Sequence, residues 1–167
     1  MTIHSSHPFP TPEDAVRRLR GHVGGTVSLW TAGSAPASWA GLTVSSWMVA
    51  NGEPGRVIGL VDPDSDLADA LAGTGLAVVQ LLSWRHRDLA EAFAGTAPAP
   101  GGPFRMEPFS STPWGPRLDS AATWAGVEVE SATEVGWSLQ VTATIADLAV
   151  GDDQESLFHR RGRYSTL

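Results

Sequence analysis

The sequence predicts a mostly β domain with short helices, in which antiparallel strands close or nearly close into a barrel. Six or seven segments have the length and composition of strands, and they dominate the middle and the end of the chain. Helices do not alternate regularly with these segments, which argues against a parallel sheet. The 167 residues fit one domain. We therefore expect a flexible arm over residues 1–10 and one domain over residues 11–167.

The first expected element is a helix that begins near Thr11-Pro12 and ends at Gly24-Gly25. Threonine can cap a helix, proline suits its first position, and acidic residues favour its positive end. Apolar side chains then recur with helical spacing at Ala15, Val16, Leu19 and Val23.

From Thr26 onward, side chains that point to the same side recur at every second residue, which predicts a strand to about Thr31. A glycine- and proline-containing turn over residues 32–38 joins it to a second strand over residues 39–45. The same signals predict further strands over residues 57–61, 76–82, 123–129, 137–145 and 157–164.

Two more short helices are expected between these strands. Asp64, Ser65 or Asp66 can cap the first, which runs through Leu71 and is closed by Gly73. Ser83 can cap the second, which runs to about residue 93. Residues 96–116 are rich in proline and glycine, so they predict a long surface loop.

Composition and charge exclude several classes of function. The formal net charge is −7 and all eleven basic residues are arginine, which argues against binding to nucleic acid or to anionic membranes. No apolar run reaches the about 18 residues needed to cross a bilayer. The first residues lack the pattern of a secretory signal. The chain has no cysteine, which excludes disulfides and thiolate chemistry. The cytoplasm is the expected location.

Common catalytic and metal-binding motifs are missing from the sequence. It contains no Gly-x-Ser-x-Gly, Gly-x-x-x-x-Gly-Lys or His-Glu-x-x-His, and no lysine for a Schiff base. His4 and His7 lie in the expected arm without further ligands, and Asp62, Asp64 and Asp66 lack the glycine and distal glutamate of a calcium loop. We expect no metal site, and no catalytic side chain can be assigned.

A polar segment at the end of the second strand is the best candidate for a binding site. Residues 41–47 contain three hydroxyls, at Thr43, Ser45 and Ser46, together with several backbone amides. Such groups can surround a phosphate or the edge of a flavin ring without a charged side chain. The alternative interpretation is an exposed strand face with ordinary β-favouring residues.

The one dense basic cluster, His159-Arg160-Arg161-Gly162-Arg163, is typical of a solvated strand edge.

The order of several motifs resembles the flavin reductase family over about residues 15–167. Gly41–Ser46 followed by Glu53-Pro54 is similar to the family's Gly-Met-Thr-Ala-Ser-Ser-Phe…Asp-Pro-Pro signature. Other matching pieces follow in the family's order: Asp62-Pro63-Asp64-Ser65, Gly75–Ser83, Leu89–Gly95, Leu118, Trp124 and Leu157–Tyr164.

This resemblance implies a six-stranded, Greek-key split barrel that forms a homodimer and binds FMN, or else FAD, near the subunit interface. Family members commonly use NADH or NADPH to reduce flavin, often for a monooxygenase partner. Carried over by position, the flavin contacts would be Thr43, Val44, Ser45 and Ser46, with Asp62 and Ser65 near the phosphate tail. Gln80 would lie near the ring, and His159, Arg161 and Arg163 near the cofactor edge or the dinucleotide entrance.

The chain also departs from the family pattern. Asp66 and Leu67 stand where a hydroxyl and a basic residue are common, so Arg56 or Arg85 would have to compensate for the acidic turn. Trp137 and Ser138 replace a frequent Asp-His pair. Three hypotheses follow: an NAD(P)H-dependent flavin oxidoreductase, a non-catalytic module that binds flavin or another planar ligand, or an empty barrel that serves assembly.

Overall fold

The computed structural model describes the backbone of residues 12–167 and the side chains from residue 15 onward. The expected N-terminal arm, its two histidines and the helix cap at Thr11 lie outside the described residues. Within the described part of the chain, no helix has the length and apolar character needed to span a membrane.

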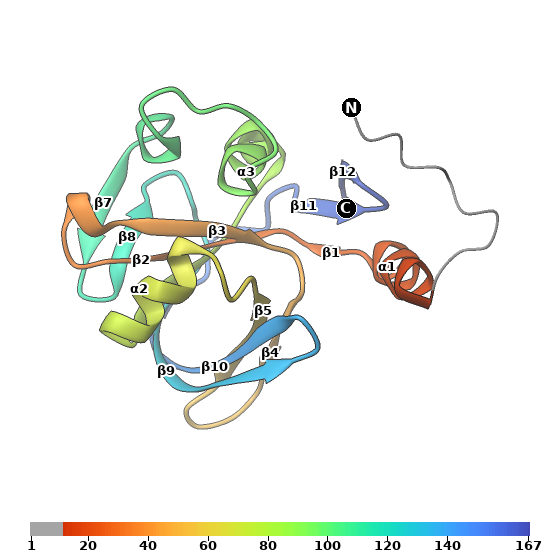
Figure 1. The fold of residues 1–167 in the computed structure, drawn as a ribbon. Coiled ribbons are helices and arrows are strands. Elements are labelled where there is room, and N and C mark those ends of the chain that lie inside the picture. Colours follow the sequence, from red (N-terminus) through yellow and green to blue (C-terminus); the bar gives the residue numbers. More distant parts are fainter. Residues whose placement is uncertain (1–11) are drawn as a thin grey trace.

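The central element is one antiparallel sheet of seven strands that curls into a half-barrel (Figure 1). The strand order is β3-β2-β6-β9-β10-β5-β4. Its strands are β2 (Ser28–Ala32), β3 (Ala40–Val44), β4 (Trp47–Ala50), β5 (Arg56–Val61), β6 (Leu76–Leu81), β9 (Trp124–Val135) and β10 (Ser138–Ala149). The prediction of a mostly β split barrel with short helices is confirmed.

Two small sheets flank the barrel. The first joins β1 (Gly25–Thr26) to the hairpin of β11 (Leu157–Arg160) and β12 (Arg163–Thr166). It lies beside helix α1 (Pro12–Val23), away from the body of the barrel (Figure 1). The second is the hairpin of β7 (Phe109–Thr112) and β8 (Gly115–Leu118).

Local sequence signals explain the two shorter helices. The Ser65 hydroxyl accepts a hydrogen bond from the Ala68 amide and so caps α2 (Asp66–Thr74). This helix runs past the expected end, because Gly75, with a φ of 67°, closes it rather than Gly73. After Ser83, a turn of 3₁₀ helix (Trp84–His86) leads into α3 (Arg87–Phe93).

The core has two parts on either side of the sheet. Trp30 is fully buried in the larger part, inside the half-barrel, where its indole NH donates to the Ser28 hydroxyl over 3.0 Å. Its ring packs directly over Gly59 of β5, so a Cβ at that position would lie 2.6 Å from the ring. The smaller part holds α3 against the outer side.

Several strands differ from the sequence-based expectation. Strand β4 was missed because it is a short edge strand that exposes Met48 and Val49. The expected loop over residues 96–116 holds β7 and the start of β8, whose strands are only four residues long. The expected last strand is a hairpin, because Arg161 and Gly162 adopt positive φ and reverse the chain.

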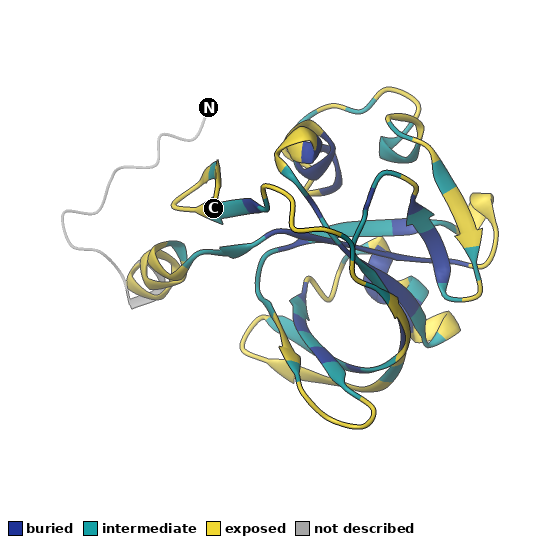
Figure 2. Cartoon of the chain, turned by 180° about the vertical axis from the view of Figure 1, so that it is seen from behind, coloured by how far each residue is buried: buried dark blue, intermediate teal, exposed yellow. Residues whose placement is uncertain are grey.

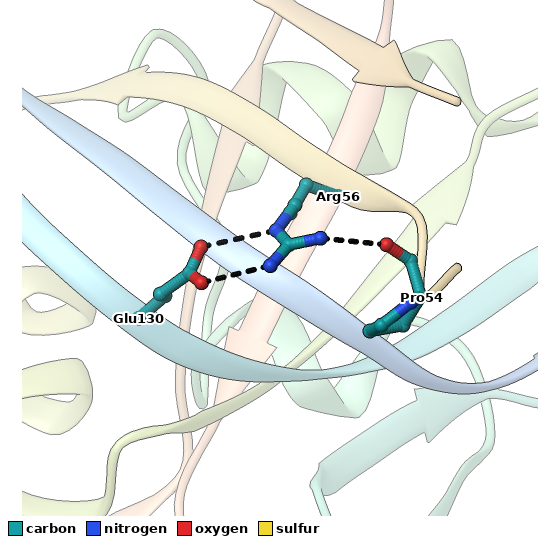
Figure 3. Close-up of polar contacts among 3 residues, drawn as sticks. All are labelled: Pro54, Arg56 and Glu130. Atoms are coloured by element: carbon teal, nitrogen blue, oxygen red, sulfur yellow. Dashed lines mark hydrogen bonds and ion pairs between the residues drawn. The ribbon is translucent and has the colours of Figure 1, made fainter. Parts of the chain in front are cut away.

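Arg56 bridges two strands of the barrel wall (Figure 3). Its guanidinium makes two hydrogen bonds to Glu130, at 3.0 and 3.2 Å, and one to the Pro54 carbonyl at 2.8 Å. The pair is more than a third exposed, so it adds little stability. Arg56 is therefore engaged with β9 and not with the acidic turn that it was expected to compensate.

The packing of Trp30 over Gly59 predicts a stability effect. Gly59→Ala should lower the free energy of unfolding by about 1–3 kcal/mol, because the ring must move to admit a methyl group. The matched control is Gly73→Ala in α2, where no atom lies within 4 Å of the added Cβ; it should raise stability by about 0.5–1 kcal/mol. Urea unfolding measures both values, and an unchanged midpoint for Gly59→Ala would contradict the packing argument.

Candidate functional site

A groove runs between helix α1 and the barrel. It consists of three adjoining cavities of about 730, 400 and 250 Å³, and Arg20 of α1 lines all of them. Ser45 and Ser46 line the two smaller cavities, and Leu60 lines the two larger ones. We call this surface the α1 groove. The two larger cavities each lie in the range of roughly 300–1,000 Å³ that is typical of small-molecule sites.

The floor of the α1 groove is the turn between β3 and β4. Ser45 and Ser46 form this turn, and the Leu60 amide donates to the Ser46 carbonyl over 2.9 Å. Gly25 of β1 passes against the Ser45 carbonyl, where a side chain would collide. The two hydroxyls are therefore held at a defined place on the groove floor.

One wall of the α1 groove is basic. Arg17 and Arg20 are three residues apart, which places them on one face of α1. Arg20 Nη2 lies 3.4 Å from the Ser46 hydroxyl and donates to it. The sequence has no carboxylate from residue 15 to residue 52, so this wall is positive in a protein of net charge −7. Asp62 also lines the largest cavity.

The rest of the largest cavity is apolar and includes one exposed aromatic residue. Val16 and Leu60 line it, together with Trp137 at the turn between β9 and β10. The Trp137 residue is 78 % exposed. A wide indole face at the mouth of a cavity can stack against a planar ligand.

His159 faces the smallest cavity from β11. Burial, and then the positive charge of Arg20, lower the pKa of His159 below its usual value of 6.5. The imidazole is therefore neutral at neutral pH. Its ring lies 5.0 Å from that of Tyr164 on the neighbouring strand, which restricts its orientation.

The structure brings together four of the residues that the sequence predicted for the site. Ser45, Ser46, Asp62 and His159 all line the α1 groove. Arg161 and Arg163 lie close by but line a separate cavity of about 370 Å³, together with Arg160.

The other four predicted residues do not line the groove. The Thr43 hydroxyl donates to the Ala90 carbonyl, and Val44 is buried in the core. The Ser65 hydroxyl caps α2 and donates to the Asp62 carbonyl. The fully buried Gln80 donates to Thr31 and accepts from the Leu118 amide, so both of its amide atoms are used inside the protein.

Sequence reasoning missed Arg17 and Arg20. Their three-residue spacing is a signal that the sequence contains, but the sequence does not show which face of the helix meets a cavity. The apolar face of α1 is exposed in the structure: Val16, Leu19 and Val23 are each more than 60 % exposed. Most of α1 is coloured as exposed in Figure 2. Within the described residues, no three His, Asp or Glu side chains come close enough to hold a metal ion.

A family model described as flavin reductase like domain matches residues 20–167. Similar solved structures include the NADH:FAD oxidoreductase of Streptomyces globisporus, at 19% identity and a TM-score of 0.81, covering 96% of both chains. The styrene monooxygenase flavin reductase of Pseudomonas putida has 20% identity and a TM-score of 0.78, covering 91% of this chain and 96% of that one. The flavin reductase component of a bacterial two-component tryptophan halogenase has 17% identity and a TM-score of 0.80, covering 93% and 98%. No curated protein sequence matches the chain.

The contact between His159 and the basic wall predicts a change in titration. Arg20→Gln should raise the pKa of His159, because the neighbouring cation no longer opposes protonation; burial should still keep the pKa below 6.5. NMR titration of the imidazole signals measures the shift. Arg105→Gln, an exposed arginine on another element, is the control and should leave His159 unchanged. An equal shift in both variants would show that the effect is not local.

Proposed function

Because the chain belongs to the flavin reductase-like domain family, we propose that it transfers hydride from NADH or NADPH to a flavin. The observation that supports this most directly is the α1 groove, which places two hydroxyls, two guanidinium groups and an apolar wall around one space. A flavin nucleotide needs those three kinds of surface: donors for its ring edge, cations for its phosphate, and apolar contact for its ring faces.

The groove residues fit the ring of a flavin. Ser45 and Ser46 would donate to the polar edge of the ring, and Leu60 would contact its face. Arg17 and Arg20 would attract an anionic nucleotide into the groove. FMN is the proposed ligand and FAD the alternative; one similar protein carries NADH:FAD oxidoreductase in its name.

The turn over residues 62–66 does not fit the phosphate. It carries Asp62, Asp64 and Asp66, and the Asp62 carboxylate accepts from the Asp64 amide over 2.9 Å. The Ser65 hydroxyl already has two partners in the chain. A phosphate there would face three like charges.

The chain's part in the reaction is to bind and orient. A bound flavin supplies the acceptor for hydride from the nicotinamide. Hydride transfer itself needs no protein acid or base, so this part of the reaction requires no catalytic side chain in the groove. Leu60 and Val16 exclude water from the ring faces, and Trp137 offers a surface on which the nicotinamide can stack.

The second candidate function is a module that binds flavin, or a related planar ligand, without turnover. Trp137 favours it: the same indole that can stack on a nicotinamide can also fill the space that the nicotinamide needs. The two functions differ in whether a dinucleotide is consumed.

The proposed partner is a flavin-dependent monooxygenase or halogenase that consumes the reduced flavin. Two of the similar proteins are named as reductase components of such systems. The cytoplasmic location expected from the cysteine-free sequence stays a prediction.

We also propose that the protein is a homodimer that uses the apolar face of α1. This helix stands beside the barrel with Val16, Leu19 and Val23 exposed, and Met48 and Val49 of edge strand β4 are exposed as well. Exposed apolar groups at helical spacing are typical of a surface that packs against another chain.

Purified protein mixed with FMN tests the proposed function. We expect it to turn yellow with bound flavin and to oxidise NADH or NADPH when flavin is present. Binding without consumption of either dinucleotide would support the non-catalytic module. A protein that takes up neither FMN nor FAD would overturn both candidates and leave the empty barrel.

The groove floor is tested by the Ser45→Ala/Ser46→Ala variant in the same titration. Its flavin affinity should fall, because each lost hydrogen bond costs about 0.5–1.5 kcal/mol. Ser110→Ala/Ser111→Ala, which removes two exposed hydroxyls from β7, is the matched control and should bind like the wild type. If both double variants bind equally well, the flavin lies elsewhere.

The proposed dimer is tested by sedimentation velocity of Leu19→Asp. A charge in the apolar face of α1 should shift the protein from dimer to monomer. Val150→Asp, at a position 75 % exposed on another part of the surface, should remain dimeric. A monomeric wild type at every concentration tested would overturn the proposal.

A further inference from the structure

The turn of the β11–β12 hairpin uses residues that are unfavourable for its conformation. Arg161 and Gly162 link the strands with φ values of 53° and 76°. Two-residue turns with both φ positive favour Asn-Gly, because a bulky side chain is strained there. Arg161 is the one non-glycine residue with positive φ in the described part of the chain.

The strands beside this turn add a second unfavourable feature. Arg160 and Arg163 are direct partners across the antiparallel pair. Like charges directly opposite each other destabilise a pair of strands. From residue 156 to residue 167 the sequence has no aspartate or glutamate that could balance them, and the ion pairs found within residues 15–167 involve only Arg56 and Arg87 among the arginines.

Anchoring of the hairpin explains part of this arrangement. The Arg161 amide donates to the Gly21 carbonyl over 3.0 Å, and Arg160 Nε donates to the His22 carbonyl over 2.9 Å. These bonds satisfy free carbonyls at the C-terminal end of α1, where positive charge is favourable. They do not account for the guanidinium groups of Arg161 and Arg163.

The three arginines surround a cavity of about 370 Å³, which we call the arginine pocket. It lies next to the α1 groove, because a Cβ built on Gly24, a residue that lines the groove, would lie 3.1 Å from the Cβ of Arg160. Gly21, which accepts the bond from Arg161, lines the groove as well. A ligand held in the groove can therefore extend to the arginine pocket.

We propose that the arginine pocket binds the terminal phosphate of a nucleotide whose ring occupies the α1 groove. Guanidinium groups suit phosphate oxygens, since each offers two parallel donors and a permanent charge. The phosphate has two possible sources, the 5′-phosphate of FMN and the 2′-phosphate of NADPH. The identification of the nucleotide rests on the proposed function, whereas the phosphate site itself does not.

The first experiment does not depend on flavin or dinucleotide. Inorganic phosphate is titrated into the full chain at constant ionic strength, and the Nε–H signals of the arginines are followed by NMR. The signals of Arg160, Arg161 and Arg163 should shift with saturation, and that of Arg105 should not. Equal shifts for all arginines, or none, would overturn the arginine pocket.

The second experiment identifies the source of the phosphate. The affinities for FMN and riboflavin are compared, as are the values of kcat/KM for NADPH and NADH. In Arg163→Gln, either the preference for FMN over riboflavin or the preference for NADPH over NADH should fall about tenfold. This is the change expected for the loss of one charge-assisted hydrogen bond. The affected pair names the source, and Arg105→Gln is the control. If neither preference changes, the nucleotide phosphate does not bind here.

A third variant separates ligand binding from folding. Arg161→Asn places the favoured residue in the turn, so the midpoint of thermal unfolding should rise while the phosphate preference falls. If the unfolding midpoint and the phosphate preference instead change in the same direction, Arg161 has a structural role and the proposal is contradicted. If the wild type binds no flavin and oxidises no dinucleotide, the proposed function is wrong. The titration with inorganic phosphate then still tests whether the arginine pocket binds phosphate.

Discussion

The packing of Trp30 over Gly59 is the contact on which the candidate site depends. Strands β2 and β5 are separated by three strands in the sheet, so the indole can reach Gly59 only because the sheet curls. The same curl brings the two edge strands, β3 and β4, to one place, where Ser45 and Ser46 join them. The Leu60 amide bonded to the Ser46 carbonyl fixes this turn to β5. The packing of the Trp30 ring over Gly59 thus allows the curl that places the Ser45 and Ser46 hydroxyls on the groove floor.

Helix α1 shapes the site from outside the barrel. Its C-terminal carbonyls are bound by the β11–β12 hairpin, and its apolar side faces solvent in the single chain. The basic side contributes Arg17 and Arg20 to the groove, and Val16 and Val23 of the apolar side line it as well. In the proposed dimer, the subunit contact would therefore border the proposed ligand site. These two uses would explain why a helix that adds little to the core has a strongly amphipathic sequence.

Charge is distributed unevenly in this acidic protein. Six of its eleven arginines lie in α1 and the last hairpin, and five of these line the α1 groove or the arginine pocket, while the turn over residues 62–66 carries three aspartates. Because a phosphate would be repelled by one of these places and attracted by the other, electrostatics would set the direction in which the proposed nucleotide lies along the groove. The acidic turn resembles the phosphate turn of the family, but its aspartates would repel a phosphate. Its Ser65 hydroxyl is also already used in hydrogen bonds within the chain.

The sequence by itself determined the fold class, most strands of the barrel, the cap of α2 at Ser65 and the serines at the end of β3, because alternation and turn residues are local signals. It did not reveal β4 or the β7–β8 hairpin, whose strands are short and lack clear alternation. Only the tertiary structure decided which polar residues share a surface. It enclosed Gln80, turned Thr43 toward α3 and brought Arg20 beside Ser46, since these outcomes depend on how distant segments pack and not on their own composition. The positive φ of Arg161 likewise depends on the reversal of the chain between β11 and β12.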